Sequence, residues 1–168
     1  EVVQHHLNGL QKNSKEFFKS LYEQLAQDWH NKFGRIQICL GPNAPQRCST
    51  DMLTLCRKLS ERYDLNIHMH LLETSAQQKR IKEIYPEGIV SYLDRLGLLS
   101  SKLSVAHAVW LEDHEIDQLS ANEVSIVHNP ASNLVLGSGI APVNAYLDQG
   151  MNVALGTDAS NCGSSHNL

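Results

Sequence analysis

Five short apolar stretches recur along the chain, and segments with helical periodicity separate them. The apolar stretches cover residues 36–40, 66–72, 103–109, 124–128 and 152–157. Stretches of this kind that alternate with helical segments predict repeated β–α–β units, and such units build a parallel sheet. Right-handed crossovers place the helices on one side of the sheet when it curls steadily. The pattern therefore predicts an α/β fold with five parallel strands in sequential order and helices on the outer face.

Polar residues mark where the helical segments begin. Asn13, with a glutamate three residues later, resembles a capping box and predicts the start of a long amphipathic helix. Ser49 and Ser75 are expected to cap the next two helices, because a serine side chain can accept a hydrogen bond from the first helical turn. A further helix is expected to begin near Asp113, and residues 129–141, which include two glycines, are expected to form a loop.

The length of the chain fits five of these units but not a complete eight-stranded barrel. A (β/α)8 or TIM barrel needs about 250 residues, whereas the chain has 168. No low-complexity linker or run of like charges interrupts the series. We therefore expect residues 1–168 to form one incomplete domain, a partial TIM barrel whose three N-terminal strands are missing.

The charge and composition of the chain argue against nucleic acids and membranes as binding partners. The net charge is −4, and acidic and basic residues are interspersed, so the sequence lacks the basic stripe of a nucleic-acid-binding protein. No apolar run approaches the roughly 18 residues of a membrane span. Cys39, Cys48, Cys56 and Cys162 show no CxxC spacing, which favours buried, reduced thiols over a disulfide framework. We therefore expect a cytoplasmic protein that binds neither nucleic acid nor membranes.

Residues with metal-binding or acid–base chemistry stand at the ends of the predicted strands. His70 and Glu73 lie at the end of the second strand, His107 lies near the end of the third, and Asp158 follows the fifth. In eight-stranded α/β barrels the carboxyl ends of the strands form the face that carries the active site. The pattern therefore predicts that metal ligands and a proton carrier meet on one face.

The spacing of His68 and His70 places both side chains on the same face of a strand. Such a pair can chelate a metal ion, but two barrel-interior histidines satisfied by hydrogen bonds fit the pattern equally well. Glu73 favours the metal interpretation. The strand ends there, so the carboxylate can curl back over a metal-activated water and carry its proton to a leaving group.

The other candidate residues each have a structural alternative. His107 could be a core histidine, although its place one unit after His70 favours a contact with the metal-activated water or the substrate. Asp158 could cap the next helix instead of binding a metal. Asn133 can order the loop after the fourth strand or reach a ligand, and loop-ordering hydrogen bonds explain Ser132 at least as well as a role in a site.

Taken together, these segments resemble the amidohydrolase superfamily. The likeness is to the branch that holds methylthioadenosine/S-adenosylhomocysteine deaminases, guanine and cytosine deaminases, and triazine chlorohydrolases. It runs from about Arg35 to the end of the chain, and its motifs match strands five to eight of that barrel in order and spacing. The matching stretches are IHMHLLETS (67–75), VAH (105–107), HNPASNL (128–134), GSGIAPV (137–143) and LGTD (155–158).

The resemblance implies a role for each candidate residue. His70 would bind the metal ion, Glu73 would shuttle protons, and His107 would orient the water or the substrate. Asp158 would bind the metal ion and act as a base towards the water. The family's remaining metal ligands form a His-x-His pair on the first strand, which the expected five strands do not include. The pair that contains His68 is not that pair, because only three strands follow it.

Two places depart from the nucleoside deaminases of this branch. Asn43 stands where those enzymes have a histidine, in a turn that follows strand four. Asn161 and Cys162 are more similar to the triazine hydrolases. Both differences predict a compact neutral ring with an amino group in preference to an adenosine-type nucleoside. The expected substrate contacts are Asn43, Glu73 and Asn133.

The resemblance thus predicts a metal-dependent hydrolase, a deaminase or chlorohydrolase, that acts on carbon–nitrogen bonds of a small nitrogen heterocycle. Zinc is the expected metal, because His and Asp ligands with an open position suit it, and iron or another divalent ion would fit the same ligands. The intact enzyme is expected to be a homo-oligomer, and residues 1–168 alone are expected to be inactive. The alternative is a non-catalytic fragment or scaffold that retains these residues but cannot hold a metal ion.

Overall fold

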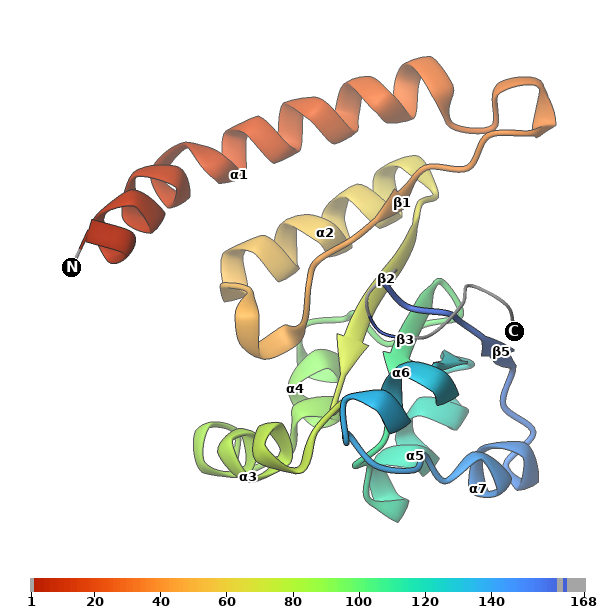
Figure 1. Ribbon diagram of the computed structural model, residues 1–168. Helices are drawn as coiled ribbons and strands as arrows, with labels where there is room; N and C mark the ends of the chain where they lie inside the picture. The colour runs from red at the N-terminus through yellow and green to blue at the C-terminus, as the bar shows by residue number, and fades with distance from the viewer. Residues whose placement is uncertain (1, 160–161, 163–168) are drawn as a thin grey trace.

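The chain folds around a curved parallel sheet of five strands (Figure 1). A computed structural model describes residues 2–159 and 162, with side chains from residue 15 onward. Each strand pairs in parallel with the next one along the chain, in the order β1-β2-β3-β4-β5. This order confirms the predicted sequential α/β sheet of a partial barrel. The strands are β1 (Cys39–Leu40), β2 (Asn66–Leu71), β3 (Leu103–His107), β4 (Ser125–His128) and β5 (Val153–Leu155).

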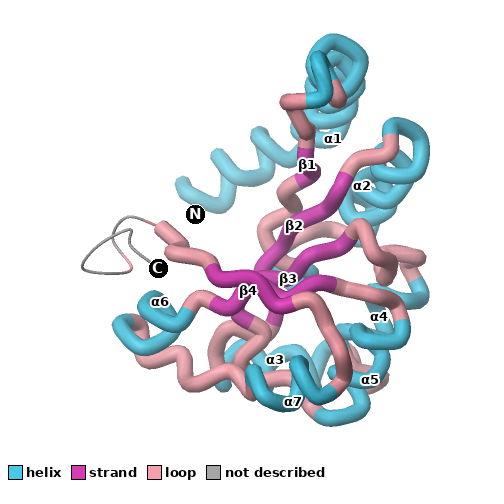
Figure 2. The backbone as a smooth tube through the Cα atoms, turned by 90° about the vertical axis from the view of Figure 1, so that its right-hand side faces the viewer, coloured by secondary structure: helices cyan, strands magenta, loops and turns pink. Residues whose placement is uncertain are grey.

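Helices alternate with the strands, and Figure 2 shows α2, α4 and α5 along one face of the sheet. The first helix begins at Val2, so the predicted start at Asn13 is wrong. The segment after β4, expected to be a loop, contains the short helix α6. The helices are α1 (Val2–Trp29), α2 (Thr50–Tyr63), α3 (Ser75–Ile84), α4 (Ile89–Arg95), α5 (Asp113–Ala121), α6 (Pro130–Val135) and α7 (Val143–Asp148), with 3-10 turns η1 (Lys32–Gly34) and η2 (Pro45–Arg47).

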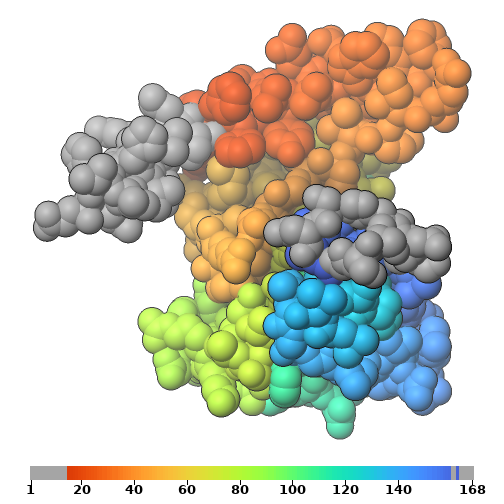
Figure 3. Space-filling model, viewed as in Figure 1, coloured from red at the N-terminus to blue at the C-terminus, as the bar shows by residue number. Residues whose placement is uncertain are grey.

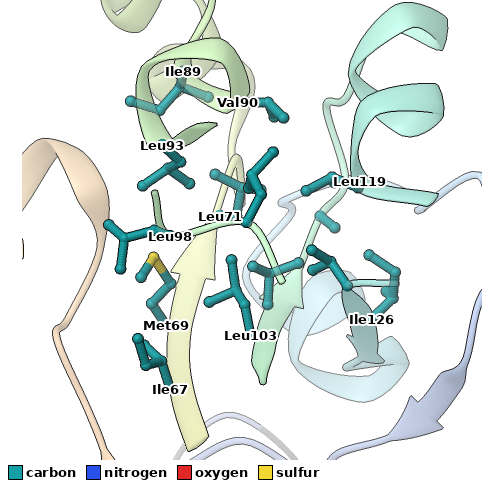
Figure 4. Close-up of a cluster of buried hydrophobic side chains, with 14 of the residues drawn as sticks. Ile67, Met69, Leu71, Ile89, Val90, Leu93, Leu98, Leu103, Leu119 and Ile126 are labelled. Carbon is teal, nitrogen blue, oxygen red and sulfur yellow. The ribbon is translucent and has the colours of Figure 1, made fainter. Parts of the chain in front are cut away.

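Alternation along β2 separates the core from the site. Ile67, Met69 and Leu71 are buried, and Figure 4 shows them among side chains from α4 and the neighbouring strands. His68 and His70 occupy the alternate positions, because successive side chains of a strand point to opposite faces. The apolar residues of β2 thus lie on the face covered by helices, and both histidines lie on the opposite face.

The N-terminal part of the chain forms one side of the molecule, where α1 packs against α2 (Figure 3). Within the described residues, no helix combines the length and apolar character needed to cross a bilayer. Cys56 is buried, and burial, with Cys48 adding to it, raises the pKa of its thiol to about 12. Cys39 is exposed, so the expectation of a buried thiol is wrong at that position.

The start of α3 lies directly after Glu73 and is held by a capping box. Thr74, not Ser75 as predicted, is the N-cap: its hydroxyl accepts a hydrogen bond from Gln77 N at 3.2 Å. In return, Gln77 Oε1 accepts from the backbone N–H groups of Glu73 at 2.8 Å and Thr74 at 3.4 Å. These bonds fix the backbone from which the Glu73 side chain projects.

We expect Thr74→Ala to lower the free energy of unfolding by about 0.5–2 kcal/mol, the usual cost of losing an N-cap side chain. Ser75→Ala is the matched control, because Ser75 is the first helical residue and its loss should change stability by less than about 0.5 kcal/mol. Urea unfolding of the two variants checks this. Equal losses would contradict the assignment of Thr74 as the cap.

Candidate active site

The carboxyl ends of the strands bring three of the predicted residues together. His70 is the second-to-last residue of β2, His107 is the last residue of β3, and Asp158 follows β5. The imidazole rings of His70 and His107 stack with their centroids 5.4 Å apart. Asp158 Oδ2 lies 3.8 Å from His107 Nε2. Residues that are far apart in sequence thus form one polar cluster, as the parallel topology predicts.

His70 is held by the main chain of the turn that follows β1. The carbonyl oxygen of Asn43 accepts hydrogen bonds from the backbone N–H of His70 at 2.9 Å and from its ring Nδ1 at 2.6 Å. Because a carbonyl oxygen can only accept, Nδ1 carries a proton, and in the neutral ring Nε2 has the lone pair. The exposed side chain of Asn43 accepts a hydrogen bond from Arg47 at 3.2 Å.

The backbone turns sharply at His107, and this turn changes where its side chain points. Simple alternation from Leu103 and Val105, which are buried in the core, would place His107 with them. Instead, His107 has φ 69° and Ala108 has φ 48°, both in the left-handed region. The imidazole therefore stacks on His70, and its side chain is only 1% exposed. Two adjacent non-glycine residues in this region are a local strain, and such strain tends to gather at functional sites.

His107 and Asp158 both receive partners from α6. Asn133 Oδ1 accepts a hydrogen bond from His107 Nδ1 at 2.8 Å, so Nε2 is the ring atom that faces Asp158. The Ser132 hydroxyl donates to Asp158 Oδ2 at 2.5 Å, and the backbone N–H of Ala159 donates to Oδ1 at 2.7 Å. The sequence allows either a loop-ordering role or a role in a site for Ser132, and it does not predict the helix that presents this residue.

These contacts hold Asp158 in its ionised form. Burial raises the pKa of its carboxyl group, but the hydrogen bonds from Ser132 and Ala159 and the nearby His107 and His70 lower it more. The pKa therefore lies below its usual range. Asp158 also has φ 64°, so the chain turns away from β5 at this residue.

Glu73 follows the end of β2 and His68 lies within that strand, and no described hydrogen bond joins either side chain to the cluster. Within the described residues, no hydrogen bond or ion pair joins the Glu73 carboxylate to His70, His107 or Asp158. His68 Nδ1 lies 2.8 Å from the hydroxyl oxygen of Ser104 on β3. Burial lowers the pKa of His68, and His70 and His107 lower it further, so its neutral form is favoured.

Gly156 lets the loop that carries Asp158 lie close to the end of β4. A Cβ atom at Gly156 would lie 2.8 Å from Asn129 Nδ2 and 2.9 Å from Val127 Cγ1. Such contacts are too short for a side chain, so the close approach requires glycine here. Asn161, which the sequence likens to the triazine hydrolases, lies outside the described residues.

The donor set fits a divalent metal ion, although it supplies few ligands. The free lone pair of His70 Nε2 and the ionised carboxylate of Asp158 are donors that zinc accepts. Among the described residues, no group of three or more His, Cys, Asp or Glu side chains is arranged to hold a metal ion. Catalytic zinc sites use three protein ligands, so these two residues would form part of a ligand set.

Residues 6–168 match the sequence model of the amidohydrolase family. A 5'-deoxyadenosine deaminase from Methanopyrus kandleri is 43% identical over 135 residues, which are 80% of this chain and 31% of that protein. The chain thus spans about a third of the length of the curated relatives it matches.

Solved structures agree with these matches. An adenosine deaminase from Xanthomonas campestris with bound zinc superposes with a TM-score of 0.83 and 29% identity, covering 88% of this chain and 33% of that one. An atrazine chlorohydrolase from Arthrobacter aurescens, complexed with zinc, gives a TM-score of 0.82 and 28% identity, with coverages of 89% and 33%. This chain therefore has the fold of about a third of each of these two enzymes.

Proposed function

Because this chain belongs to the amidohydrolase family, we propose that its site takes part in the metal-dependent hydrolysis of a nitrogen heterocycle. The reaction replaces an amino or similar leaving group on a ring carbon with oxygen from water. One observation carries the proposal: His70, His107 and Asp158 meet at the carboxyl end of the sheet. A hydrogen bond at Nδ1 of each histidine leaves its Nε2 free.

His70 and Asp158 are the residues that would hold the metal ion. His70 would bind through Nε2, since Nδ1 is committed to Asn43, and Asp158 would bind through its carboxylate. Zinc is our first choice, in line with the zinc in the two related structures, and iron fits the same donors. When bound, such an ion supplies Lewis-acid activation of the attacking water. Further ligands are expected from the first-strand His-x-His pair that the family likeness implies.

The remaining groups move protons and orient the attacking water. Asp158, which is ionised at neutral pH, takes a proton from the attacking water. Glu73 moves the other proton of that water to a ring nitrogen, and after the water oxygen has added to the ring carbon the proton held by Asp158 passes to the leaving group. His107 orients the attacking water by accepting its hydrogen bond at Nε2, which has the lone pair because Nδ1 donates to Asn133. A leaving amino group departs as ammonia.

Two observations point to different substrates. The identity to a 5'-deoxyadenosine deaminase favours an adenine nucleoside as the first candidate. Asn43 favours a compact free base or triazine, the substrate class predicted from the sequence, because an exposed amide stands where a histidine is expected in nucleoside deaminases. The match to an atrazine chlorohydrolase is compatible with this second candidate.

A panel assay of the intact enzyme, loaded with zinc, distinguishes these candidates. The panel contains 5'-deoxyadenosine, methylthioadenosine, guanine, cytosine and a chlorotriazine, with release of ammonia or chloride as the readout. Fast turnover of the two nucleosides supports the first candidate, and turnover of a free base or the triazine supports the second. No turnover and no tightly bound metal would support the alternative of a non-catalytic scaffold. The 168-residue chain alone is the control, and we expect it to be inactive.

A further inference from the structure

Helix α6 has the reverse of the usual helix polarity. Its adjacent polar residues Ser132 and Asn133 are each only 1% exposed, whereas the apolar residues Leu134, Val135 and Leu136 that follow are 67%, 63% and 53% exposed. A surface helix normally buries its apolar side chains. Burying polar groups costs free energy unless they are hydrogen-bonded. Specific partners must therefore hold Ser132 and Asn133 inside.

Those partners are the polar groups of the candidate site. The Ser132 hydroxyl donates to Asp158 Oδ2 at 2.5 Å, and Asn133 Oδ1 accepts from His107 Nδ1 at 2.8 Å. The buried Nδ2 of Asn133 has no hydrogen-bond partner among the described residues, which lowers stability. Helix α6 is thus arranged around these two contacts and not for the best burial of its own side chains.

The backbone holds both side chains in place. Asn133 N donates to the carbonyl oxygen of Asn129 at 2.9 Å, and its own carbonyl accepts from Ser138 N at 2.8 Å. Asn129 directly follows β4, so the helix is tied to the end of that strand. A short, anchored helix can therefore set the positions of groups on two other strand ends, β3 and β5.

We propose that Ser132 and Asn133 are positioning residues of the hydrolytic site, each acting through a different group. Ser132 fixes the orientation of the Asp158 carboxylate. Asn133 keeps the proton of His107 on Nδ1, so that the lone pair of Nε2 faces the reacting groups. This proposal rests on the proposed function, and it assigns Asn133 an indirect role in place of substrate contact.

The role of Asn133 follows from the chemistry of a neutral imidazole. The ring has two tautomers, and a hydrogen bond at one nitrogen selects between them. Without the Asn133 oxygen, the proton of His107 is free to move to Nε2, 3.8 Å from Asp158 Oδ2. The lone pair would then lie on Nδ1, which points away from Asp158.

The first experiment measures this tautomer without any assay of activity. Long-range 1H–15N spectra of 15N-histidine-labelled protein, recorded where the imidazole is neutral, should show the His107 proton on Nδ1. Asn133→Ala should shift the tautomer population of His107 towards the Nε2–H form. Leu134→Ala, at an exposed position of the same helix, should leave that population unchanged. A wild-type His107 protonated on Nε2, or an unchanged tautomer in Asn133→Ala, would overturn the role of Asn133.

The second experiment uses the intact enzyme at saturating zinc. Ser132→Ala and Asn133→Ala should each lower kcat about 10–100-fold, the range typical of groups that orient metal-site residues, with little change in KM. Ser132→Thr, which keeps the hydroxyl, should recover most of the loss, and Leu134→Ala should keep full activity. Unchanged kcat in Ser132→Ala, or an equal loss in Leu134→Ala with its thermal unfolding unchanged, would overturn the proposal.

The two experiments separate this proposal from the proposed function. If the wild-type enzyme turns over no member of the panel, the proposed function fails, and the tautomer measurement still decides what Asn133 does. If the enzyme turns over a substrate but neither variant changes kcat, the proposed function stands and the positioning roles are wrong. Melting temperatures of all the variants identify any that fail to fold.

Discussion

Glu73→Gln lowers kcat of the intact enzyme by about 10²–10⁴-fold, the usual contribution of a positioned general acid or base. The amide keeps the shape of the side chain but cannot carry a proton. The backbone of Glu73 is held by Gln77, which accepts its N–H at 2.8 Å, and this bond does not depend on the side chain. The variant should therefore keep its fold and its bound metal while it loses turnover.

Glu83→Gln is the matched control for this prediction. Glu83 lies on the same helix, α3, and forms an exposed ion pair with Arg80. Exposed pairs of this kind contribute little to stability, so turnover should not change. Steady-state kinetics and metal analysis of both variants provide the measurement. Near-normal turnover in Glu73→Gln would show that another group carries the proton.

His70→Ala is expected to remove metal binding, with a loss of affinity greater than the 10–100-fold typical of residues that only support a metal ligand. Nδ1 of His70 is hydrogen-bonded to the carbonyl oxygen of Asn43, so Nε2 is the ring nitrogen that remains free to bind a metal ion. His68→Ala is a sharp control, because His68 lies two residues earlier on the same strand face but is bonded to Ser104. It should keep the metal ion.

Equilibrium dialysis against zinc, followed by metal analysis, compares these two variants with the wild-type enzyme. Equal loss of metal in both variants would mean that the His-x-His pair of β2 acts as a chelate, contrary to our assignment. Retention of metal in His70→Ala would remove this residue from the ligand set altogether.

The sheet and its order could be predicted because each strand is a short continuous apolar stretch and because successive β–α–β units pair in parallel and in order. Each predicted strand overlaps an observed one, although β1 and β5 at the two ends of the described sheet are shorter than expected. The residue that caps each helix was harder to predict. Thr74 and Ser75 are both good caps by composition, and only the reciprocal bonds with Gln77 decide between them.

The site could be located from sequence, but not the way its groups are held. His70, His107 and Asp158 follow apolar stretches, which is a visible signal. The left-handed backbone at His107 is not visible, because histidine is not a residue that demands it. Helix α6 was missed because its buried residues are polar and its exposed residues are apolar. A prediction from hydrophobic periodicity would place the apolar side chains in the core and the polar side chains in solvent, which is the reverse of what the structure has.

The nearest-neighbour order of the strands also bears on how the chain acquires its structure during synthesis. Among the five described strands, each one after β1 pairs with the strand made just before it, so each new unit leaving the ribosome finds the edge it needs already formed. None of the four pairings within this described sheet needs a distant partner, and the cost of closing each intervening segment rises only slowly with its length. The sheet can therefore grow in the direction of translation, with β5 as the last described strand to be added.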